Sequence, residues 1–187
     1  MKEFPVRKHP RLKGYDYSQN GAYFVTFCVK GGHEMLGRVV GRDALGAPSI
    51  RDAHGRLHIE LSDYGEAVRR EIEETQICYD GVVVDKYVVM PNHVHLIIHI
   101  KRNGGVIPGR NGEVPGNHGA PRASRPTSAL VPNIVAVIKR KTNKAFGFNM
   151  WQKSYHDHII RDEDEYQRIW QYIDENPAKW TEDKYYG

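Results

Sequence analysis

Two kinds of hydrophobic pattern divide the chain into segments. Short runs rich in β-branched and aromatic residues, bounded by turn residues, predict strands. Two of these runs, 82–90 and 93–100, are separated only by Pro91 and Asn92, so they form an antiparallel hairpin. Both halves are strongly apolar, which predicts that the hairpin lies at the centre of the sheet. The predicted strands cover residues 22–29, 36–40, 57–61, 82–90, 93–100 and 150–160.

Apolar residues spaced by three and four positions predict three helices. The first begins at Ser62 and Asp63 and runs to about residue 76. The second spans about 134–146 and ends at Gly147, and the third begins after the capping residue Asp162 and continues until Pro177. Strands and helices mix without regular βαβ repeats, so we expect an α+β fold in which helices pack on an antiparallel sheet.

The length of 187 residues fits one domain, 1–187. Three segments have no hydrophobic period. Residues 1–20 are polar and basic, 41–55 contain the turn residues of a surface loop, and 101–127 are dominated by Gly, Pro, Asn and Arg. We interpret 101–127 as a flexible insertion in the domain.

The charge is mildly basic, with 27 Lys and Arg against 23 Asp and Glu and a net charge of +4. This balance permits a nucleic-acid partner without requiring one. The only cysteines, Cys28 and Cys78, are far apart, which argues against a disulfide framework or a structural zinc site. The sequence has neither an 18-residue apolar run nor a signal peptide, so we expect a cytoplasmic protein without a membrane partner.

His93 and His95 begin a predicted strand two residues apart, so both imidazoles leave one face of the sheet. Such a pair has the spacing that a single metal ion needs, although neutral histidines also occur in protein cores. The His-x-His metal site of amidohydrolases opens a larger barrel than the chain after His95 can form. His99 shares the face but lies roughly 13 Å farther along the strand, and we leave it out of the site.

Tyr172 and Asn176 lie on a side of the last helix that packing does not explain. At about 100° per residue, Tyr172 points roughly 110° away from the apolar stripe formed by Tyr166, Ile169, Trp170 and Ile173. Asn176 follows one turn later on the same side. Tyr172 could simply cover the edge of the stripe. Alternatively, the Asn176 carbonyl could complete a site with the two histidines for a divalent ion such as Mg²⁺ or Mn²⁺.

Basic residues that could contact phosphates gather in two places. The second helix carries four of them within six residues, and the N-terminal segment carries others. These cations predict either a solvated surface or a path for a nucleic-acid backbone. The candidate DNA-binding residues are Lys139, Arg140, Lys141, Lys144, Arg11 and Lys13.

Five motifs together resemble those of bacterial REP-associated tyrosine transposases, which belong to the single-tyrosine, His-hydrophobic-His class. The resemblance spans nearly the whole chain apart from 101–127, and the combination is far more specific than the His-Val-His element alone. The motifs are LKGYDYS at 12–18, GAYFVT at 21–26, VVMPNHVH at 88–95, WQKSYHDHIIR at 151–161 and YIDENPAKW at 172–180.

The resemblance implies a ferredoxin-like α+β fold with the histidine pair on a central strand. It implies a metal-dependent single-stranded DNA endonuclease and strand transferase that forms a 5′-phosphotyrosine on hairpin-forming repeat DNA. His93, His95 and Asn176 would then bind the metal, and Tyr172 would be the nucleophile. In part of the class two protomers form the working dimer. A cytoplasmic, nucleoid-associated location would follow from this function.

Two other functions remain open from the sequence. One is a nucleic-acid-binding protein that keeps the fold without doing chemistry, and the other is a small metal hydrolase unrelated to DNA. For the nucleophile, Tyr155 and Tyr166 are the alternatives to Tyr172. We rank both lower, because Tyr155 lies on a predicted strand and Tyr166 lies on the apolar stripe.

Overall fold

The computed structural model describes residues 19–40, 58–101 and 130–186. Most of the predicted basic arm, with Arg11 and Lys13, and almost all of the predicted insertion lie outside the described residues, as does the predicted loop at 41–55. The strands are β1 (Gly21–Cys28), β2 (Gly37–Val40), β3 (His58–Leu61), β4 (Val82–Val89), β5 (His93–Ile100) and β6 (His156–Ile160). The helices are α1 (Asp63–Cys78), α2 (Leu130–Phe146) and α3 (Glu163–Glu175), with short 3₁₀ turns η1 (Lys30–Gly32) and η2 (Trp180–Glu182).

The main sheet has the strand order β4-β5-β1-β6, and every neighbouring pair is antiparallel. Together with the chain order β1-α1-β4-β5-α2-β6, this is the ferredoxin-like arrangement that the resemblance implies. Strands β2 and β3 form a separate two-stranded hairpin inserted between β1 and α1. The predicted α+β class and the central position of the histidine strand β5 are therefore confirmed.

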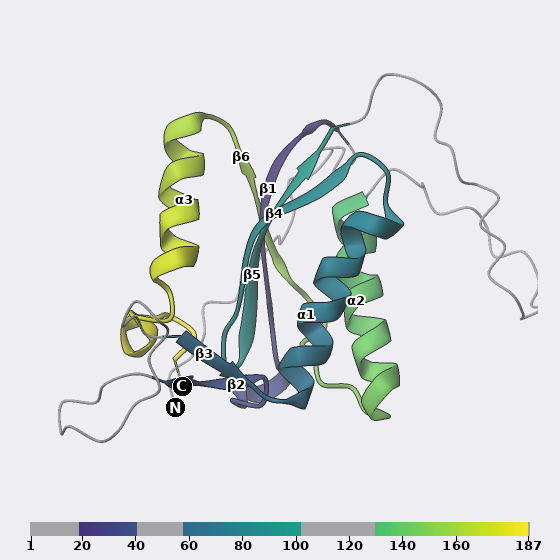
Figure 1. The fold of residues 1–187 in the computed structure, drawn as a ribbon, viewed down its shortest axis with the longest axis vertical. Coiled ribbons are helices and arrows are strands. Elements are labelled where there is room, and N and C mark those ends of the chain that lie inside the picture. The colour runs from purple at the N-terminus through teal and green to yellow at the C-terminus, as the bar shows by residue number, and fades with distance from the viewer. Residues whose placement is uncertain (1–18, 41–57, 102–129, 187) are drawn as a thin grey trace, which may run out of the picture.

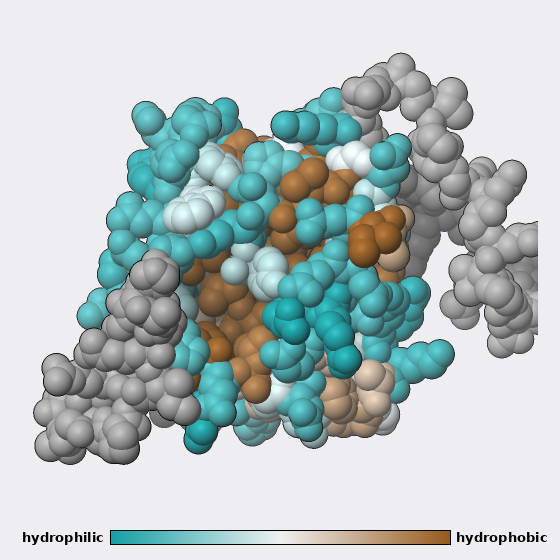
Figure 2. Space-filling view, in the orientation of Figure 1, coloured by the Kyte–Doolittle hydropathy of each residue, from teal (hydrophilic) through white to brown (hydrophobic). Residues whose placement is uncertain are grey.

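The hairpin β4-β5 is not wholly central, because β4 lies at an edge of the sheet. Its apolar character has another cause, since both α1 and α3 contact β4. Figure 2 shows this side of the molecule, where hydrophilic side chains cover α3 and α1 and apolar ones lie in the strip between the two helices. Val83 of β4 remains 44% exposed, as an edge position allows.

The two faces of the sheet carry different helices. Figure 1 shows α1 and α2 on one side and α3 on the other. Alternate residues of the central strands supply a large core facing α1 and α2, for example Phe27 and Leu96. The intervening residues supply a smaller core with α3, including Ile97 and Ile173. Because side chains alternate along a strand, His93 and His95 share the face of Ile97 and point toward α3.

The helix ends are set by the residues that the sequence predicts. The Ser62 hydroxyl accepts a hydrogen bond from the Gly65 amide at the start of α1. The Asp162 carboxylate accepts one from the Glu165 amide at the start of α3. Gly147 ends α2 with a φ of +76°, a left-handed conformation that glycine adopts readily.

The last strand is shorter than predicted, since β6 covers only His156–Ile160 instead of 150–160. Its ladder with β1 stops at the pair Thr26–His156, although β1 continues to Cys28. Beyond that pair, residues 27–28 lie opposite residues 152–155, so the register of the ladder is broken. Trp151 forms only an isolated bridge with Val29. Among the described residues, no helix is long and apolar enough to cross a membrane.

Candidate active site

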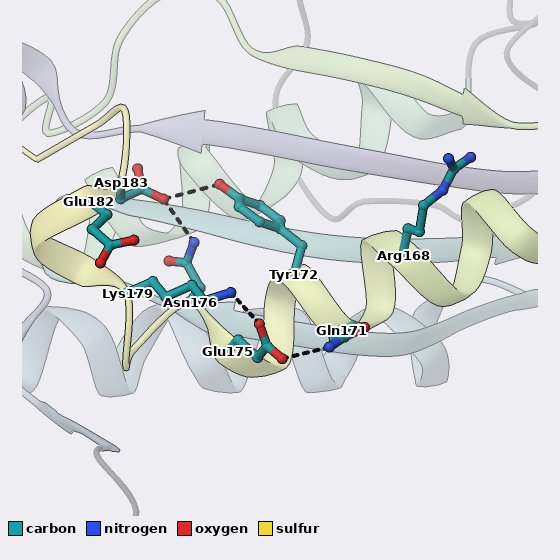
Figure 3. Close-up of a pocket in the computed structure, with 8 residues that line it drawn as sticks. All are labelled: Arg168, Gln171, Tyr172, Glu175, Asn176, Lys179, Glu182 and Asp183. Atoms are coloured by element: carbon teal, nitrogen blue, oxygen red, sulfur yellow. Dashed lines mark hydrogen bonds and ion pairs between the residues drawn. The ribbon is translucent and has the colours of Figure 1, made fainter.

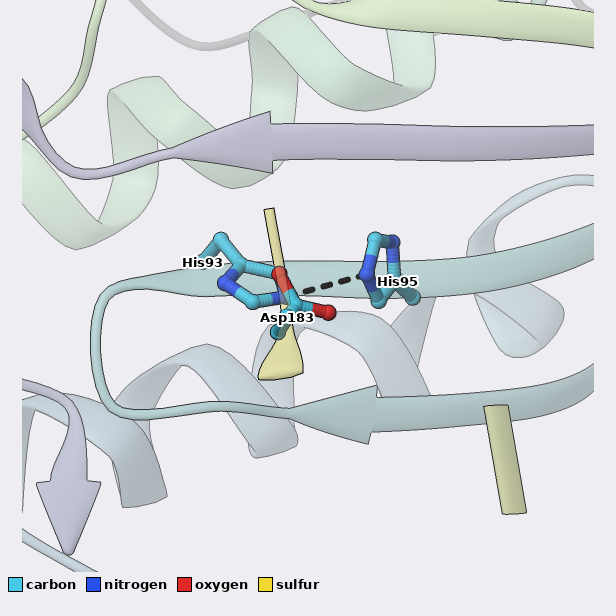
Figure 4. Close-up of side chains that lie close together, drawn as sticks. All are labelled: His93, His95 and Asp183. Atoms are coloured by element: carbon cyan, nitrogen blue, oxygen red, sulfur yellow. Dashed lines mark hydrogen bonds between the residues drawn. The ribbon is translucent and has the colours of Figure 1, made fainter. Parts of the chain in front are cut away.

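The histidine pair begins β5, immediately after the turn that Pro91 and Asn92 make. Both imidazoles are fully buried, and their Nε2 atoms lie 2.9 Å apart (Figure 4). Burial lowers the pKa of His93 to about 4. Burial, and then the neighbouring His93, lower the pKa of His95 well below its ordinary value. Both side chains are therefore neutral at pH 7, which is the state in which imidazole binds a metal ion.

Each histidine also has a hydrogen-bond partner at Nδ1, on the side of the ring away from the other histidine. The Asn92 Oδ1 lies 2.8 Å from Nδ1 of His93. The Thr26 Oγ1, from the neighbouring strand β1, lies 2.7 Å from Nδ1 of His95. These buried contacts fix the orientation of both rings, so that both Nε2 atoms face the same small space.

Helix α3 brings Tyr172 to this space. The Tyr172 hydroxyl lies 3.2 Å from Nε2 of His95, and its ring packs edge-on against that imidazole with the centroids 5.2 Å apart. The side chain is 37% exposed, so the phenol connects the buried histidines with the surface. The helix thus lies across β5, and Tyr172, at the flank of the apolar stripe, is directed at the histidines.

Asn176, one turn after Tyr172, is 2% exposed. Its Nδ2 donates a hydrogen bond of 2.8 Å to Oδ2 of Asp183. Its Oδ1 is buried and has no hydrogen-bond partner among the described residues. A buried carbonyl oxygen without a partner costs free energy. A bound cation beside it would remove that cost.

Asp183 is a residue of the site that the sequence did not predict. Its Oδ2 also accepts a hydrogen bond of 3.0 Å from the Tyr172 hydroxyl, so Tyr172 and Asn176 converge on one carboxylate (Figure 3). His93, His95 and Asp183 each offer one ligand atom within 4.8 Å of the others (Figure 4). Asp183 follows η2 in a stretch without hydrophobic period, and no motif places it near β5.

The segment that contains Asp183 covers the histidines. The Tyr185 ring lies 4.6 Å from that of His93 and 5.8 Å from that of His95, measured between centroids. The Tyr185 carbonyl accepts a hydrogen bond of 2.8 Å from Asn92. This segment therefore closes the site on the side away from β5, which accounts for the complete burial of both imidazoles.

A pocket of about 390 Å³ adjoins the site along the last turns of α3 (Figure 3). Tyr172, Asn176 and Asp183 form its inner wall. Cationic and anionic side chains are among those that line it, so it can contact a charged ligand. The residues that line it are Arg168, Gln171, Tyr172, Glu175, Asn176, Lys179, Glu182 and Asp183.

The phenol of Tyr172 is not acidic in this environment. Burial raises its pKa above the ordinary value, and the adjacent Asp183 carboxylate raises it further by its charge and hydrogen bond. The hydroxyl is therefore protonated at pH 7. Any reaction in which this oxygen attacks an electrophile needs a neighbouring acceptor for the proton.

The donor set fits a divalent cation. It combines two imidazole nitrogens with a carboxylate and with a buried amide oxygen that lacks a partner. Mixed nitrogen and oxygen ligands of this kind suit first-row divalent ions such as Mn²⁺, whereas Mg²⁺ prefers oxygen ligands. The predicted divalent-metal site is therefore compatible with the geometry, with Asp183 as an additional oxygen donor.

The basic helix α2 lies on the other face of the sheet from α3, the helix that carries Tyr172 (Figure 1). Lys139 donates two hydrogen bonds of 2.9 Å to the carbonyls of Gln152 and Ser154. Lys141 lies 2.8 Å from both Glu71 and Glu74 of α1. These two predicted DNA-binding residues thus have partners within the fold. Their DNA contacts, like those of Arg140 and Lys144, stay a prediction.

The alternative nucleophiles lie elsewhere. The Tyr166 hydroxyl donates to Asp85, and its ring packs against His99 with the centroids 5.6 Å apart. Tyr155 precedes β6 and packs against the core that faces α1 and α2. His99 lies 3.9 Å from Asp85 and is thus part of the Tyr166 cluster. Tyr172, in contrast, contacts the imidazole of His95 through both its hydroxyl and its ring.

Comparison with known proteins finds a relative in sequence and a similar solved structure. The chain is 30% identical over 194 residues to an uncharacterised protein of Haemophilus influenzae, a match that covers 96% of this chain and 93% of that protein. A REP-associated tyrosine transposase solved in complex with a REP hairpin has a similar fold, with a TM-score of 0.52 and 18% identity. That likeness covers 98% of this chain and 77% of the transposase chain. No family model matches the chain.

Proposed function

Since the chain belongs to the same family as the Haemophilus influenzae protein and has the fold of a REP-associated tyrosine transposase, we propose that it cleaves and rejoins single-stranded DNA through Tyr172. The observation that carries the proposal is the 3.2 Å separation between the Tyr172 hydroxyl and Nε2 of His95. A tyrosine beside a pair of potential metal ligands has the parts needed to attack a phosphodiester.

In the proposed reaction the Tyr172 oxygen forms a bond to the phosphorus of one phosphodiester. The bond from phosphorus to the 3′-oxygen breaks, which leaves a 5′-phosphotyrosine and a free 3′-hydroxyl. The number of phosphate ester bonds is unchanged, so the covalent intermediate keeps the energy needed for rejoining. A nucleotide cofactor is therefore not required. Rejoining is the reverse attack by a 3′-hydroxyl on the phosphotyrosine.

Asp183 supplies an acceptor for the phenol proton. Its Oδ2 already accepts the hydrogen bond of the Tyr172 hydroxyl, at 3.0 Å. A carboxylate in this position can act as a general base while the oxygen attacks. His95 is less suited to this task, because its Nε2 faces His93 and the metal position.

His93, His95 and the Asn176 carbonyl would hold the divalent ion, Mg²⁺ or Mn²⁺, with the Asp183 carboxylate as a further ligand. When bound, the ion would neutralise the negative charge of the scissile phosphate. The chain's own residues fix the geometry. The strand β5 sets the spacing of the histidines, and one turn of α3 sets the spacing of Tyr172 and Asn176.

Single-stranded or hairpin DNA is the proposed partner. The pocket along α3 offers Arg168 and Lys179 beside Tyr172 for the flanking phosphates. All the proposed site residues come from one chain, so the chemistry does not require the homodimer that is found in part of the class. Location at the nucleoid would follow from DNA binding.

The test is formation of a covalent adduct. Protein, Mn²⁺ and hairpin DNA that is labelled at its 3′ end and has a single-stranded flank are incubated, and the products are separated on a denaturing gel. We expect a labelled protein band with the wild type and with the control Tyr166→Phe, and none with Tyr172→Phe or with EDTA. A band that persists in Tyr172→Phe would refute the nucleophile. DNA that shifts on a native gel without any adduct would favour the non-catalytic alternative.

A further inference from the structure

We propose that Asn92 and Thr26 control where the protons of the two imidazoles lie. Asn92 holds His93 in a single tautomer, and Thr26 allows His95 to move its proton between ring nitrogens when a divalent ion binds. Both are positioning residues, since neither touches the ion or the DNA. The inference rests on the metal-binding part of the proposed function, but it concerns residues to which that function gives no role.

The orientation of the Asn92 amide is fixed by its own donors. Its Nδ2 donates to the carbonyls of Gly32, at 3.1 Å, and Tyr185, at 2.8 Å. The Oδ1 atom therefore faces His93, 2.8 Å from Nδ1. Because a carbonyl oxygen can only accept, Nδ1 of His93 must carry the hydrogen. The neutral ring has one N–H, so Nε2 of His93 carries a lone pair.

When no metal ion is bound, this lone pair determines which ring nitrogen of His95 carries the hydrogen. The two Nε2 atoms are 2.9 Å apart, a distance at which two lone pairs repel and a hydrogen bond is favourable. The Tyr172 hydroxyl donates to Asp183, so it does not supply this proton. The hydrogen must then sit on Nε2 of His95 and point to His93. Nδ1 of His95 is left as an acceptor, and the Thr26 hydroxyl donates to it at 2.7 Å.

A metal ion reverses the arrangement at His95. Both Nε2 atoms must present lone pairs to the ion, so the hydrogen leaves Nε2 of His95 and one appears on Nδ1. The Thr26 hydroxyl then changes from donor to acceptor. The histidine pair gains and loses no net proton. A hydroxyl can serve in both states because it can donate or accept, and water does not replace it readily because Thr26 is 1% exposed.

The tautomers can be observed directly in protein labelled with ¹⁵N-histidine. Long-range ¹H–¹⁵N spectra distinguish a protonated from an unprotonated ring nitrogen. With EDTA we expect Nδ1–H for His93 and Nε2–H for His95. With Zn²⁺ as a diamagnetic probe we expect Nδ1–H for both. A His95 tautomer that is the same with and without Zn²⁺, or an Nε2–H on His93, would overturn the inference.

Metal affinity gives an independent readout. Substituting Thr26→Val keeps the shape and removes the hydroxyl, and we expect Mn²⁺ affinity measured by titration calorimetry to fall about 10- to 100-fold. Thr26→Ser restores the hydroxyl and should restore affinity. The control Thr75→Val removes another buried threonine hydroxyl, one that donates to the Glu71 carbonyl in α1, and should leave affinity unchanged.

The outcomes separate this inference from the proposed function. Equal Mn²⁺ affinity in Thr26→Val and wild type would overturn the inference, while the adduct assay could still succeed. A wild type that binds Mn²⁺ and shows the tautomer change, yet forms no adduct with DNA, would support the inference and contradict the proposed function. A wild type that binds neither Mn²⁺ nor Zn²⁺ would refute the inference and the metal part of the function together.

Discussion

His93 and His95 are more buried than metal ligands need to be. Both are fully inaccessible, and each has a polar partner at Nδ1 from the surrounding strands or turn. Two neutral imidazoles with satisfied Nδ1 atoms can remain in a core, whereas an imidazolium there would lose its hydration. The same burial that keeps the nitrogens ready for a metal ion therefore makes the fold sensitive to acid.

We expect the stability of the metal-free protein to fall as the pH is lowered from 6.5 toward 4. Burial lowers the pKa of His93 to about 4, from an ordinary value of 6.5, and lowers that of His95 well below its ordinary value. Within this window the unfolded chain binds more protons than the native state. The free energy of unfolding should thus decrease by up to about 1.4 kcal/mol per pH unit for each imidazole.

Urea denaturation in EDTA at several pH values measures this slope. The double variant His93→Asn, His95→Asn should show a smaller pH dependence over the same window. The control His33→Asn, at an exposed position, should keep the wild-type slope. A double variant with the wild-type slope would show that the acid sensitivity arises from other groups.

The site residues differ in how far the sequence could predict them. Tyr172 and Asn176 stand out because they leave the apolar stripe of α3, a departure that helical geometry makes visible. His93 and His95 stand out by their spacing on a strand. Asp183, Thr26 and Tyr185 reach the site through tertiary structure alone, and no local pattern distinguishes them from ordinary surface or core residues.

The C-terminal segment after α3 acts as a cover over the candidate site. Tyr185 packs on both imidazoles, and Asp183 binds the Tyr172 hydroxyl. A DNA phosphate cannot reach fully buried histidines while this segment is in place. In the proposed function, the protein binds DNA productively only in the fraction of molecules in which the Tyr185 ring has moved off the imidazoles while Asp183 stays beside Tyr172.

Removing the ring of Tyr185, which packs on both histidines, should increase activity. We expect Tyr185→Ala to form the covalent adduct severalfold faster than the wild type at limiting DNA. The packing of the ring on His93 and His95 is lost, so the fraction of molecules with accessible histidines rises. The matched control is Tyr186→Ala, which removes a neighbouring tyrosine that packs on Trp180 and is 47% exposed. An unchanged or slower rate in Tyr185→Ala would mean that the ring does not restrict access.

In helix α2, a lysine that the sequence suggests for DNA binding has hydrogen-bond partners inside the fold. Lys139 binds the carbonyls of Gln152 and Ser154, and burial lowers its pKa to about 8. We expect Lys139→Met to lower the free energy of unfolding by about 1 to 3 kcal/mol, measured by urea denaturation at pH 7. Lys144→Met, in the last turn of the same helix, should change it little.

Measuring DNA affinity distinguishes a role of Lys139 in stability from a role in binding DNA. If Lys139 binds the DNA backbone, Lys139→Met should keep its stability, bind hairpin DNA more weakly and show a smaller dependence on salt concentration. If Lys139→Met instead loses stability and keeps its DNA affinity, Lys139 stabilises the fold and does not bind DNA. Arg140 and Lys144 would then be the residues of α2 to test for DNA binding.

The layers of the fold were largely predictable because their signals are local. Helical period and capping residues placed α1 and α3, and the Pro91-Asn92 turn placed the β4-β5 hairpin. Two features depend on distant contacts and were predicted wrongly. The apolar β4 lies at the sheet edge between α1 and α3. Strand β6 begins only at His156, because residues 152–155 do not keep the register with β1 beyond Thr26.

The ferredoxin-like sheet joins the two halves of the candidate site. The β4-β5 hairpin places the histidines on the face away from α1 and α2, and α3 covers that face with Tyr172 directed inward. Because both halves belong to one chain and one face, the proposed chemistry follows from the fold of a single molecule. The covalent bond between Tyr172 and DNA is its central claim.

Peptide mapping of the protein–DNA adduct tests this claim most directly. The wild type is incubated with Mn²⁺ and hairpin DNA, digested with trypsin and nuclease, and analysed by mass spectrometry. We predict a nucleotide attached through a 5′-phosphate to Tyr172 and to no other tyrosine. A nucleotide on Tyr155 or Tyr166, or cleaved DNA with no modified peptide, would contradict the account.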